Sequence, residues 1–281
     1  RPIDCWPASK TNENGRRPVV FNPHEGLQDS PLQVPCGSCD GCRADQAREW
    51  AIRMMHEAQC WAENCFITLT YADRVEKADH CLIAPKTLVK KDLQDFFKRL
   101  RKKYKFRYFA CGEYGTDTRR PHYHAVIFGQ DFLSASIPMQ DNLYNNLDLE
   151  RTWGHGHVVC APADPATFSY VAGYCAKKIG DPDTFNIAST VPPLGYEWYI
   201  KNHRDLINTG HVIFNEREYP IPKAYFRFDN SNKVCLLGGD LQKVKDDRKL
   251  KMQQRGVPEY RHLDNKQLNV KSRLTLKKEM L

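Results

Sequence analysis

Two histidines separated by a single residue, His122 and His124, give the first indication of chemistry in this sequence. They lie in the run PHYHAVIF at 121–128, whose branched and aromatic residues favour a strand. Alternate residues of a strand share a face, so we expect the two imidazoles to lie side by side. The preceding predicted strand runs toward Glu113, and a tight return would bring that carboxylate beside them. Two imidazoles and one carboxylate form a divalent-metal site with open coordination positions; an inert surface pair of histidines is the alternative.

A second set of reactive groups lies in the run SYVAGYCAKK at 169–178. In a helix, Tyr170, Tyr174 and Lys178 are four residues apart and share a face, with Lys177 at its edge. A tyrosine oxygen attacks a phosphodiester when it is deprotonated or hydrogen-bonded, and ammonium groups stabilise the charge that develops. The pattern favours phosphodiester chemistry, and core packing is the alternative for two aromatic residues at this spacing.

Helices and strands must position these groups. Apolar periodicity predicts helices at 44–61, 86–104, 165–178 and 196–206, and strands at 18–21, 65–71, 106–111, 122–128, 157–160 and 211–214. The stretch at 242–281 is charged and is expected to be helical in pieces or partly disordered. We expect an α+β fold with a mainly antiparallel sheet of about five strands and flanking helices. The tyrosine helix should cover the sheet face that carries His122 and His124.

Composition limits the classes of protein. The 281 residues carry a formal net charge of +8, and no apolar run approaches the ~20 residues that a membrane span needs. The N-terminal residues lack a signal-peptide pattern, so we expect a reducing compartment. The segment 86–107 contains ten basic and two acidic residues, which predicts a surface for the DNA backbone. The residues predicted for that surface are Lys98, Arg99, Arg101, Lys102, Lys103, Arg119 and Arg120.

Three of the eleven cysteines have the spacing of metal ligands. Cys36, Cys39 and Cys42 form a CxxCxxC pattern, and Cys5 is the candidate for a fourth ligand of a structural Zn²⁺. An iron–sulfur cluster and three free thiols are the alternatives. A second HxH pair, at 155–157, contains a glycine and is expected to form a turn that enters a strand.

Taken in order, the strand FITLTY at 66–71, Glu113, the two histidines and the tyrosine helix resemble the motifs of HUH endonucleases that initiate rolling-circle replication. The two-tyrosine helix looks like that of replication initiators of small single-stranded DNA phages. The run PCGSCDGCR at 35–43, followed by WAIR at 50–53, is similar to the replication initiators of gokushovirus-like microviruses. The resemblance covers about residues 5–225 and is weak toward the C-terminus.

The resemblance implies an RRM-like (ferredoxin-like) HUH core that cuts and rejoins single-stranded DNA at a replication origin. Mg²⁺ or Mn²⁺ held by Glu113, His122 and His124 would polarise the scissile phosphate. Tyr170 or Tyr174 would form a 5′-phosphotyrosine link and release a 3′-OH that primes the host DNA polymerase, with Lys177 and Lys178 near the phosphate. The match of 174–177 to a YxxK pattern suggests that Tyr174 is at least as important as Tyr170. A host helicase and the host bacterial cytoplasm are the expected partner and location.

Three domains are expected: a cysteine-rich, zinc-bound segment at 1–45, the endonuclease core at 46–185, and a basic extension at 186–281. Two other functions remain open. One is a relaxase or transposase with the same chemistry, although relaxase tyrosines typically precede the histidines. The other is a non-catalytic, zinc-containing nucleic-acid-binding protein.

Overall fold

The structure is a computed structural model that describes residues 3–13, 15, 17–77, 80–115, 119–177, 184–230, 240–254, 256, 261, 264–266 and 268–269. The chain forms two compact units. One contains residues 1–45 and 229–281, and the other contains residues 46–228. Among the described residues, no helix has the combined length and apolar character that crossing a bilayer requires.

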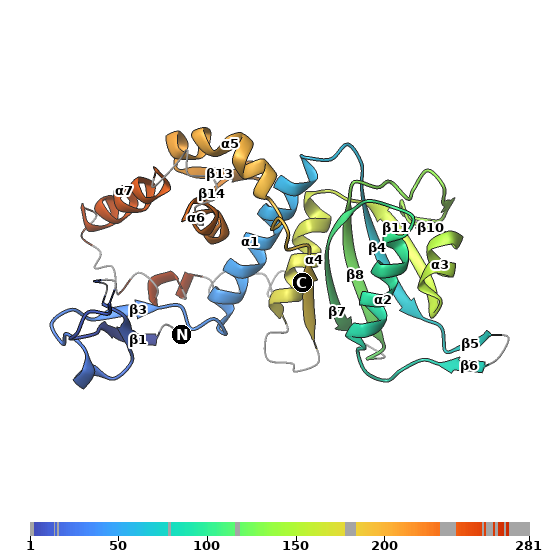
Figure 1. The fold of residues 1–281 in the computed structure, drawn as a ribbon, viewed down its shortest axis with the longest axis horizontal. Helices are drawn as coiled ribbons and strands as arrows, with labels where there is room; N and C mark the ends of the chain where they lie inside the picture. The colour runs from blue at the N-terminus through green and yellow to red at the C-terminus, as the bar shows by residue number, and fades with distance from the viewer. Residues whose placement is uncertain are drawn as a thin grey trace. The chain divides into compact units, whose positions relative to one another are not determined.

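A seven-stranded antiparallel sheet organises the larger unit (Figure 1). Its strand order is β12-β7-β8-β4-β11-β10-β9. The strands are β4 (Asn64–Tyr71), β7 (Arg107–Tyr114), β8 (Pro121–Phe128), β9 (Ile137–Pro138), β10 (Tyr144–Asn145), β11 (Gly156–Pro162) and β12 (Phe185–Ala188). The long strands β4, β7 and β8 form its centre, and the edges are short.

The alternation of side chains along β4 separates the two faces of this sheet. Cys65, Ile67, Leu69 and Tyr71 are fully buried, whereas the residues between them are only partly buried. The buried set packs against the apolar stripe of α2 (Lys90–Arg101), and α3 (Leu147–Trp153) contributes Leu149 and Trp153 to the same core. One face of the sheet is therefore the main hydrophobic core.

The opposite face is covered by α4 (Pro165–Lys177) and by α1 (Asp40–Ala58), as Figure 1 shows. Helix α4 begins where Asp164 Oδ1 accepts the backbone N–H of Thr167 at 2.7 Å, which caps its first turn. Phe168 of α4 packs on Phe128 of β8, and Trp50 of α1 packs on Phe109 of β7. The sheet thus lies between two helical layers.

The remaining elements of the larger unit are the hairpins β5 (Arg74–Lys77)–β6 (His80–Ile83) and β13 (His211–Phe214)–β14 (Arg217–Pro220), and the helices α5 (Tyr196–Thr209) and α6 (Lys223–Asn230). Helices α5 and α6 pack on α1. The buried His56 of α1 stacks on Trp198 with ring centroids 3.5 Å apart, and its Nδ1 lies 2.7 Å from the Tyr225 hydroxyl.

The smaller unit contains a three-stranded sheet of order β2-β1-β3. Its strands are β1 (Ile3–Pro7), β2 (Val19–Val20) and β3 (Leu32–Val34), with the short 3-10 helix η1 (Pro23–Glu25). The start of α1 and the helix α7 (Asp240–Gln254) belong to this unit.

The predicted α+β fold with an antiparallel sheet and flanking helices is confirmed. The expected number of about five strands is wrong, because the sheet has seven. Two of the additional strands, β9 and β10, contain only two residues each, too few to show a period of two. Strand β12 lies in a segment interrupted by proline and glycine, and it pairs with β7 at the sheet edge.

Candidate active site

Glu113 and His124 meet on the sheet face that α4 covers. In the register of β7 and β8, Glu113 lies opposite His122, and Cys111 lies opposite His124. The Glu113 side chain reaches diagonally, and its Oε1 lies 2.8 Å from His124 Nε2. Both side chains are more than nine-tenths buried. The tight return predicted from the sequence therefore does place a carboxylate beside a histidine.

Two residues of β4 hold His124, and the sequence analysis missed both. Thr68 lies opposite His124 in the register, and its Oγ1 is 3.1 Å from His124 Nδ1. The Phe66 ring lies nearly parallel to the imidazole, at 11° and a centroid distance of 5.7 Å. The sequence could have indicated both residues, because alternation along β4 puts Phe66 and Thr68 on the face opposite its buried residues.

His122 takes a different orientation from His124. Its Nδ1 lies 2.7 Å from the carbonyl oxygen of Arg120, in the turn that leads into β8. A carbonyl only accepts, so Nδ1 carries a proton, and in the neutral imidazole Nε2 is then the nitrogen with the lone pair. Among the described side chains, Glu113, His122 and His124 are not a group whose ligand atoms all lie within 4.8 Å of one another. The structure thus brings two of the three predicted ligands together.

Both predicted tyrosines lie over His124. The Tyr174 ring is nearly parallel to the imidazole, with centroids 5.3 Å apart, and the Tyr170 ring meets it edge-on at 5.7 Å. The Tyr174 hydroxyl donates a 2.6 Å hydrogen bond to the Tyr170 hydroxyl. Tyr170 is 48% exposed, whereas Tyr174 is half-buried. The predicted placement of the tyrosine helix over this sheet face matches the structure.

The two phenols differ in their surroundings. Burial raises the pKa of Tyr174, and the hydrogen bond that it donates to Tyr170 and the negative charge of Glu113 raise it further. The Tyr174 oxygen therefore keeps its proton and acts as a donor in this arrangement.

The two lysines predicted beside the tyrosines cannot be placed from the structure. Lys177 is the last residue of α4, and its side chain lies outside the described part of the chain. Lys178 lies outside the described residues altogether.

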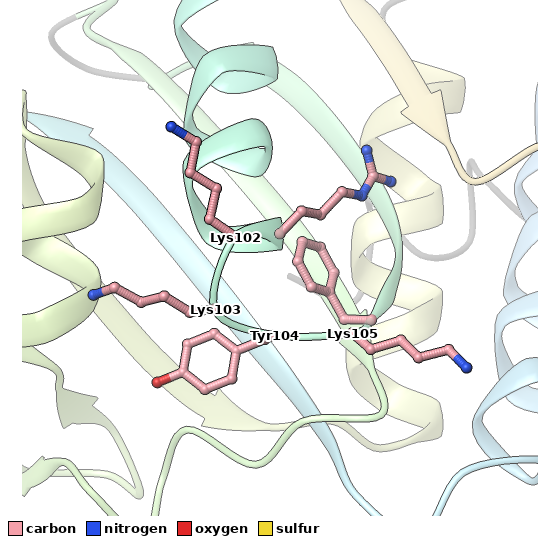
Figure 2. Close-up of a pocket in the computed structure, with 6 residues that line it drawn as sticks. Lys102, Lys103, Tyr104 and Lys105 are labelled. Carbon is pink, nitrogen blue, oxygen red and sulfur yellow. The ribbon is translucent and has the colours of Figure 1, made fainter.

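The predicted DNA surface does not form one patch with the tyrosines. Arg101, Lys102, Lys103 and Lys105 line a pocket together with Tyr104 and Phe106, where the chain passes from α2 into β7 (Figure 2). The ammonium groups of Lys102, Lys103 and Lys105 point apart and not toward one centre. Arg107 begins β7 and Glu113 lies near its end, which is about 20 Å along an extended strand. Helix α2 also covers the opposite sheet face from α4.

Several of the predicted DNA contacts take part in the fold itself. Arg99 donates to the carbonyl oxygens of Thr152 and Trp153 at 2.7 and 3.0 Å. Lys98 forms an ion pair with Asp95 and keeps its side chain 70% exposed. These contacts leave Lys98 accessible to a phosphate, whereas Arg99 holds α3 against α2.

The arginines of the β7–β8 turn lie nearest the site. Arg120 pairs with Asp73 at 2.8 Å and donates to the Tyr71 carbonyl, and its own carbonyl holds His122. The Arg119 guanidinium lies over the Tyr114 ring, 4.8 Å from its centroid. Of the predicted basic surface, only this pair is next to the metal-ligand candidates in the strand register.

The three cysteines of the CxxCxxC run gather in the smaller unit. Their sulfur atoms all lie within 4.8 Å of one another. The Ser38 hydroxyl and backbone N–H groups donate to Cys36 Sγ and lower its pKa to about 5. Cys5, the predicted fourth ligand, is not part of the group. It is buried in β1, opposite Leu32 of β3, and its Sγ donates to the Leu32 carbonyl at 3.5 Å.

The second HxH pair forms no such group. Gly156 begins β11, and His157 Nδ1 lies 3.5 Å from Glu150 Oε1. The predicted turn into a strand therefore agrees with the structure. Glu150 lies in α3 and not in a neighbouring strand, so spacing along the sequence does not indicate this contact.

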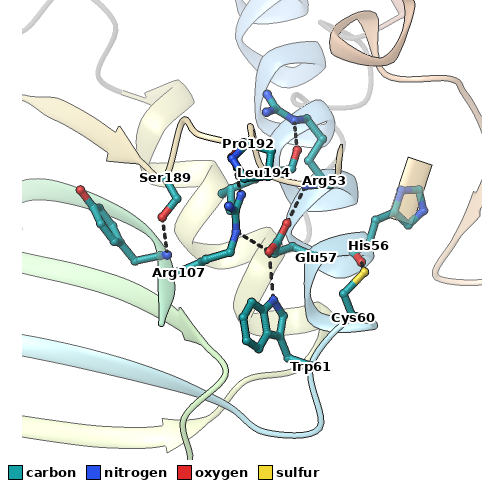
Figure 3. A network of polar contacts seen from close by, with 11 residues as sticks. Arg53, His56, Glu57, Cys60, Trp61, Arg107, Ser189, Pro192 and Leu194 are labelled. Atoms are coloured by element: carbon teal, nitrogen blue, oxygen red, sulfur yellow. Dashed lines mark hydrogen bonds and ion pairs between the residues drawn. The ribbon is translucent and has the colours of Figure 1, made fainter. Parts of the chain in front are cut away.

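A buried charge network holds β7 against α1 (Figure 3). Glu57 Oε1 accepts from Arg107 Nε at 2.7 Å and from Trp61 Nε1 at 3.0 Å, and its Oε2 accepts from Gly195 N at 2.8 Å. Arg107 also donates to the Pro192 carbonyl at 2.6 Å. The network fixes the beginning of the strand that carries Glu113.

Comparisons with known proteins bear on the role of the chain. The family model "Replication-associated protein ORF2/G2P" matches residues 64–179, from the start of β4 to just beyond α4. A replication-associated protein VP4 of Bdellovibrio phage phiMH2K is 34% identical over 239 residues, which cover 79% of this chain and 76% of that protein. This chain belongs to the family of phage replication-associated proteins. The relationship to microvirus replication proteins predicted from the sequence is thereby confirmed.

Two other replication-associated proteins are similar to this chain at lower identity. The replication-associated protein ORF2 of Spiroplasma virus 4 is 28% identical over 216 residues, which cover 69% of this chain and 67% of that protein. ORF4 of Chlamydia phage 1 is 26% identical over 217 residues, and the match covers 69% of this chain and 52% of that longer protein. No solved structure matches this family member significantly.

Proposed function

We propose that this protein nicks and rejoins single-stranded DNA at a replication origin and so initiates rolling-circle replication of a small phage genome. One observation carries the proposal. Two tyrosine hydroxyls on one helix lie over a buried carboxylate–imidazole pair, within a replication-associated protein. Membership of the family supports a replication role, and the tyrosines and metal-ligand candidates support transesterification as its chemistry.

The residues present fit a divalent ion of the Mg²⁺ or Mn²⁺ type. Ligands at about 2.1 Å in octahedral geometry lie about 3 Å apart when they are adjacent. The 2.8 Å between Glu113 Oε1 and His124 Nε2 matches that separation. His122 keeps the Nε2 lone pair, because its Nδ1–H is held by the Arg120 carbonyl, a pattern typical of metal-ligating histidines. Its ring would have to turn to complete the site.

A divalent ion held by Glu113, His122 and His124 would supply positive charge beside the scissile phosphate. The chain supplies the nucleophile and its orientation. The attacking tyrosine oxygen forms a bond to phosphorus, the P–O3′ bond breaks, and the released O3′ takes up a proton. The products are a 5′-phosphotyrosine link and a free 3′-OH, and the number of phosphoester bonds is unchanged.

The second tyrosine allows the reaction to be repeated without hydrolysis. After one round of synthesis, the other hydroxyl attacks the regenerated origin, and the new 3′-OH attacks the first phosphotyrosine link. The first tyrosine leaves with its proton restored, and a circle is closed. Host DNA polymerase would extend the 3′-OH, and a host helicase would separate the strands in the bacterial cytoplasm.

A covalent-trapping assay tests this proposal. Overlapping single-stranded fragments of the genome that encodes this chain are labelled at the 3′ end, because the tyrosine retains the downstream fragment. Each is incubated with the full chain and Mn²⁺ or Mg²⁺, then denatured. We expect a labelled protein band on one fragment, lost with EDTA and in the Tyr170→Phe/Tyr174→Phe double variant.

The matched control is Tyr219→Phe, which changes one phenol in the hairpin β13–β14. It should form the adduct at the wild-type rate. Binding of every fragment with no cleavage in either metal would contradict the proposal and favour the non-catalytic nucleic-acid-binding alternative.

A further inference from the structure

The structure places a second chemical group outside the nicking site. Cys36, Cys39 and Cys42 lie where the chain passes from β3 into the first turn of α1. Their sulfur atoms all lie within 4.8 Å of one another, and the Cys39 and Cys42 sulfurs are 3.5 Å apart. All three side chains are half-buried and so remain accessible from solvent. Proximity of three thiols in a turn is unusual enough to require an explanation.

These distances match a tetrahedral zinc site. Zinc–thiolate bonds are about 2.3 Å long, so two sulfurs on one tetrahedral ion lie about 3.8 Å apart. The Cys39–Cys42 separation of 3.5 Å is close to that value, and the other two sulfur–sulfur separations do not exceed 4.8 Å. Thiolates are soft ligands that select Zn²⁺ over the hard cations expected at the nicking site.

The local backbone is built to hold the three sulfurs together. Gly37 has φ of +78°, a conformation that glycine adopts at little cost, and it reverses the chain between Cys36 and Ser38. The Cys39 backbone N–H donates to Cys36 Sγ at 3.3 Å. Cys42 lies in the first turn of α1, where the helix dipole favours negative charge. One turn of the loop thus brings Cys36 and Cys39 together, and the first turn of the helix brings Cys39 and Cys42 together.

We propose that Cys36, Cys39 and Cys42 bind one Zn²⁺ as three thiolates, with the fourth coordination position filled by a ligand from outside this group. Binding displaces the thiol protons and involves no oxidation or reduction. Cys5 is not a ligand, because β-pairing with Leu32 fixes it inside the small sheet with its sulfur on a carbonyl. The ion fastens the β3–α1 turn to the start of α1.

Metal content of the untagged full chain tests the proposal without use of the nicking reaction. Zinc is measured by plasma mass spectrometry after growth in zinc-supplemented medium and purification without chelators. We expect one zinc per chain in the wild type, and none in Cys39→Ser or Cys42→Ser. Cys60→Ser is the matched control, since Cys60 is another half-buried thiol that lies outside the group, and it should keep its zinc.

Three further measurements keep the result decisive if a serine variant does not fold. Cys39→His replaces one zinc ligand by another and should retain the metal. X-ray absorption at the zinc edge of the wild type should show at least three sulfurs at about 2.3 Å in a four-coordinate site. Loss of bound zinc in chelator should lower the unfolding temperature, and added zinc should restore it.

Several outcomes would overturn the proposal. Fewer than three sulfur neighbours, or loss of zinc in a folded Cys5→Ser variant, would refute this ligand set. Iron and sulfide with broad visible absorption would identify a cluster in place of zinc. A Cys39–Cys42 disulfide, or a protein that binds no zinc on titration, would show that no metal site exists.

Discussion

The hydrogen bond between the two tyrosines predicts which of them attacks first. The Tyr174 hydroxyl donates to the Tyr170 oxygen at 2.6 Å, so Tyr170 is the acceptor of the pair. Tyr170 is also the more exposed ring, at 48%, and Tyr174 packs on His124. An oxygen that gains negative charge while accepting a hydrogen bond is stabilised as it attacks. We therefore expect Tyr170 to make the first cut, whereas the YxxK match of the sequence indicated only that Tyr174 is at least as important as Tyr170.

The size of the effect follows from the same contact. A hydrogen bond to a charged oxygen contributes about 1.5–3 kcal/mol. Its loss in Tyr174→Phe should slow the first cleavage by roughly 10- to 150-fold, since each 1.36 kcal/mol changes a rate tenfold. Tyr170→Phe removes the attacking oxygen itself and should abolish the first cut. The rates of the first cleavage by the two single variants should thus differ by far more than a factor of two.

Single-turnover cleavage of a 3′-labelled origin fragment measures both rates, with enzyme in excess over DNA. Peptide mass spectrometry then locates the adduct, which we expect on Tyr170 in the wild type and in Tyr174→Phe. Tyr219→Phe again serves as the control for a lost phenol. An adduct on Tyr174 in the wild type, together with a Tyr170→Phe variant that cleaves within a few-fold of it, would refute the reasoning.

Three predictions concern stability and are measured by thermal or denaturant unfolding. Glu57→Gln leaves Arg107 buried without its charged partner, so it should destabilise the larger unit by roughly 3–5 kcal/mol; a change below 1 kcal/mol would contradict a role for this pair. His56 is held neutral by burial, which lowers its pKa to about 3. The unfolded state takes up the proton first, so stability is lost as pH falls below about 6.5, by about 2 kcal/mol at pH 5; His56→Gln should remove this part of the pH dependence, and an unchanged slope would argue against it. Gly156→Ala places a Cβ 2.2 Å from a backbone nitrogen at φ +150°, so strain should lower the free energy of unfolding by at least roughly 1–3 kcal/mol. The control Gly173→Ala, in α4, places its Cβ in open space and should be neutral or stabilising. Equal effects of the two substitutions would refute the steric argument.

The elements that carry the site could be predicted from their apolar patterns. Strands β4 and β8 lie within one residue of the expected ranges, and α4 begins at the expected residue. Strand β4 alternates between buried and partly buried side chains, whereas β8 is a short apolar run that is buried on both faces, and both patterns predict strands. A period of two also predicted that His122 and His124 share a face.

What could not be predicted depends on contacts between residues distant in sequence. The ring of His122 turns to the Arg120 carbonyl, and spacing alone does not determine a side-chain torsion. Arg99 donates its hydrogen bonds to backbone carbonyl oxygens of α3. Periodicity did not predict this helix because it has only seven residues. The sequence offers Cys5 as a candidate fourth ligand, and only the pairing of β1 with β3 shows that its sulfur contacts a carbonyl oxygen.

The asymmetry of the tyrosine pair bears on how two nucleophiles can alternate in one site. On the proposed function, formation of the first phosphotyrosine converts the Tyr170 oxygen into an ester oxygen, which is a weaker acceptor than a phenolate. The hydrogen bond from Tyr174 then weakens, and its hydroxyl is the one that remains beside His124 and Glu113. The first reaction thereby frees the second nucleophile. Tyr174→Phe should accordingly allow the first cut, while rejoining that needs a second cut should be lost entirely, and a variant that still closes circles would rule out this order.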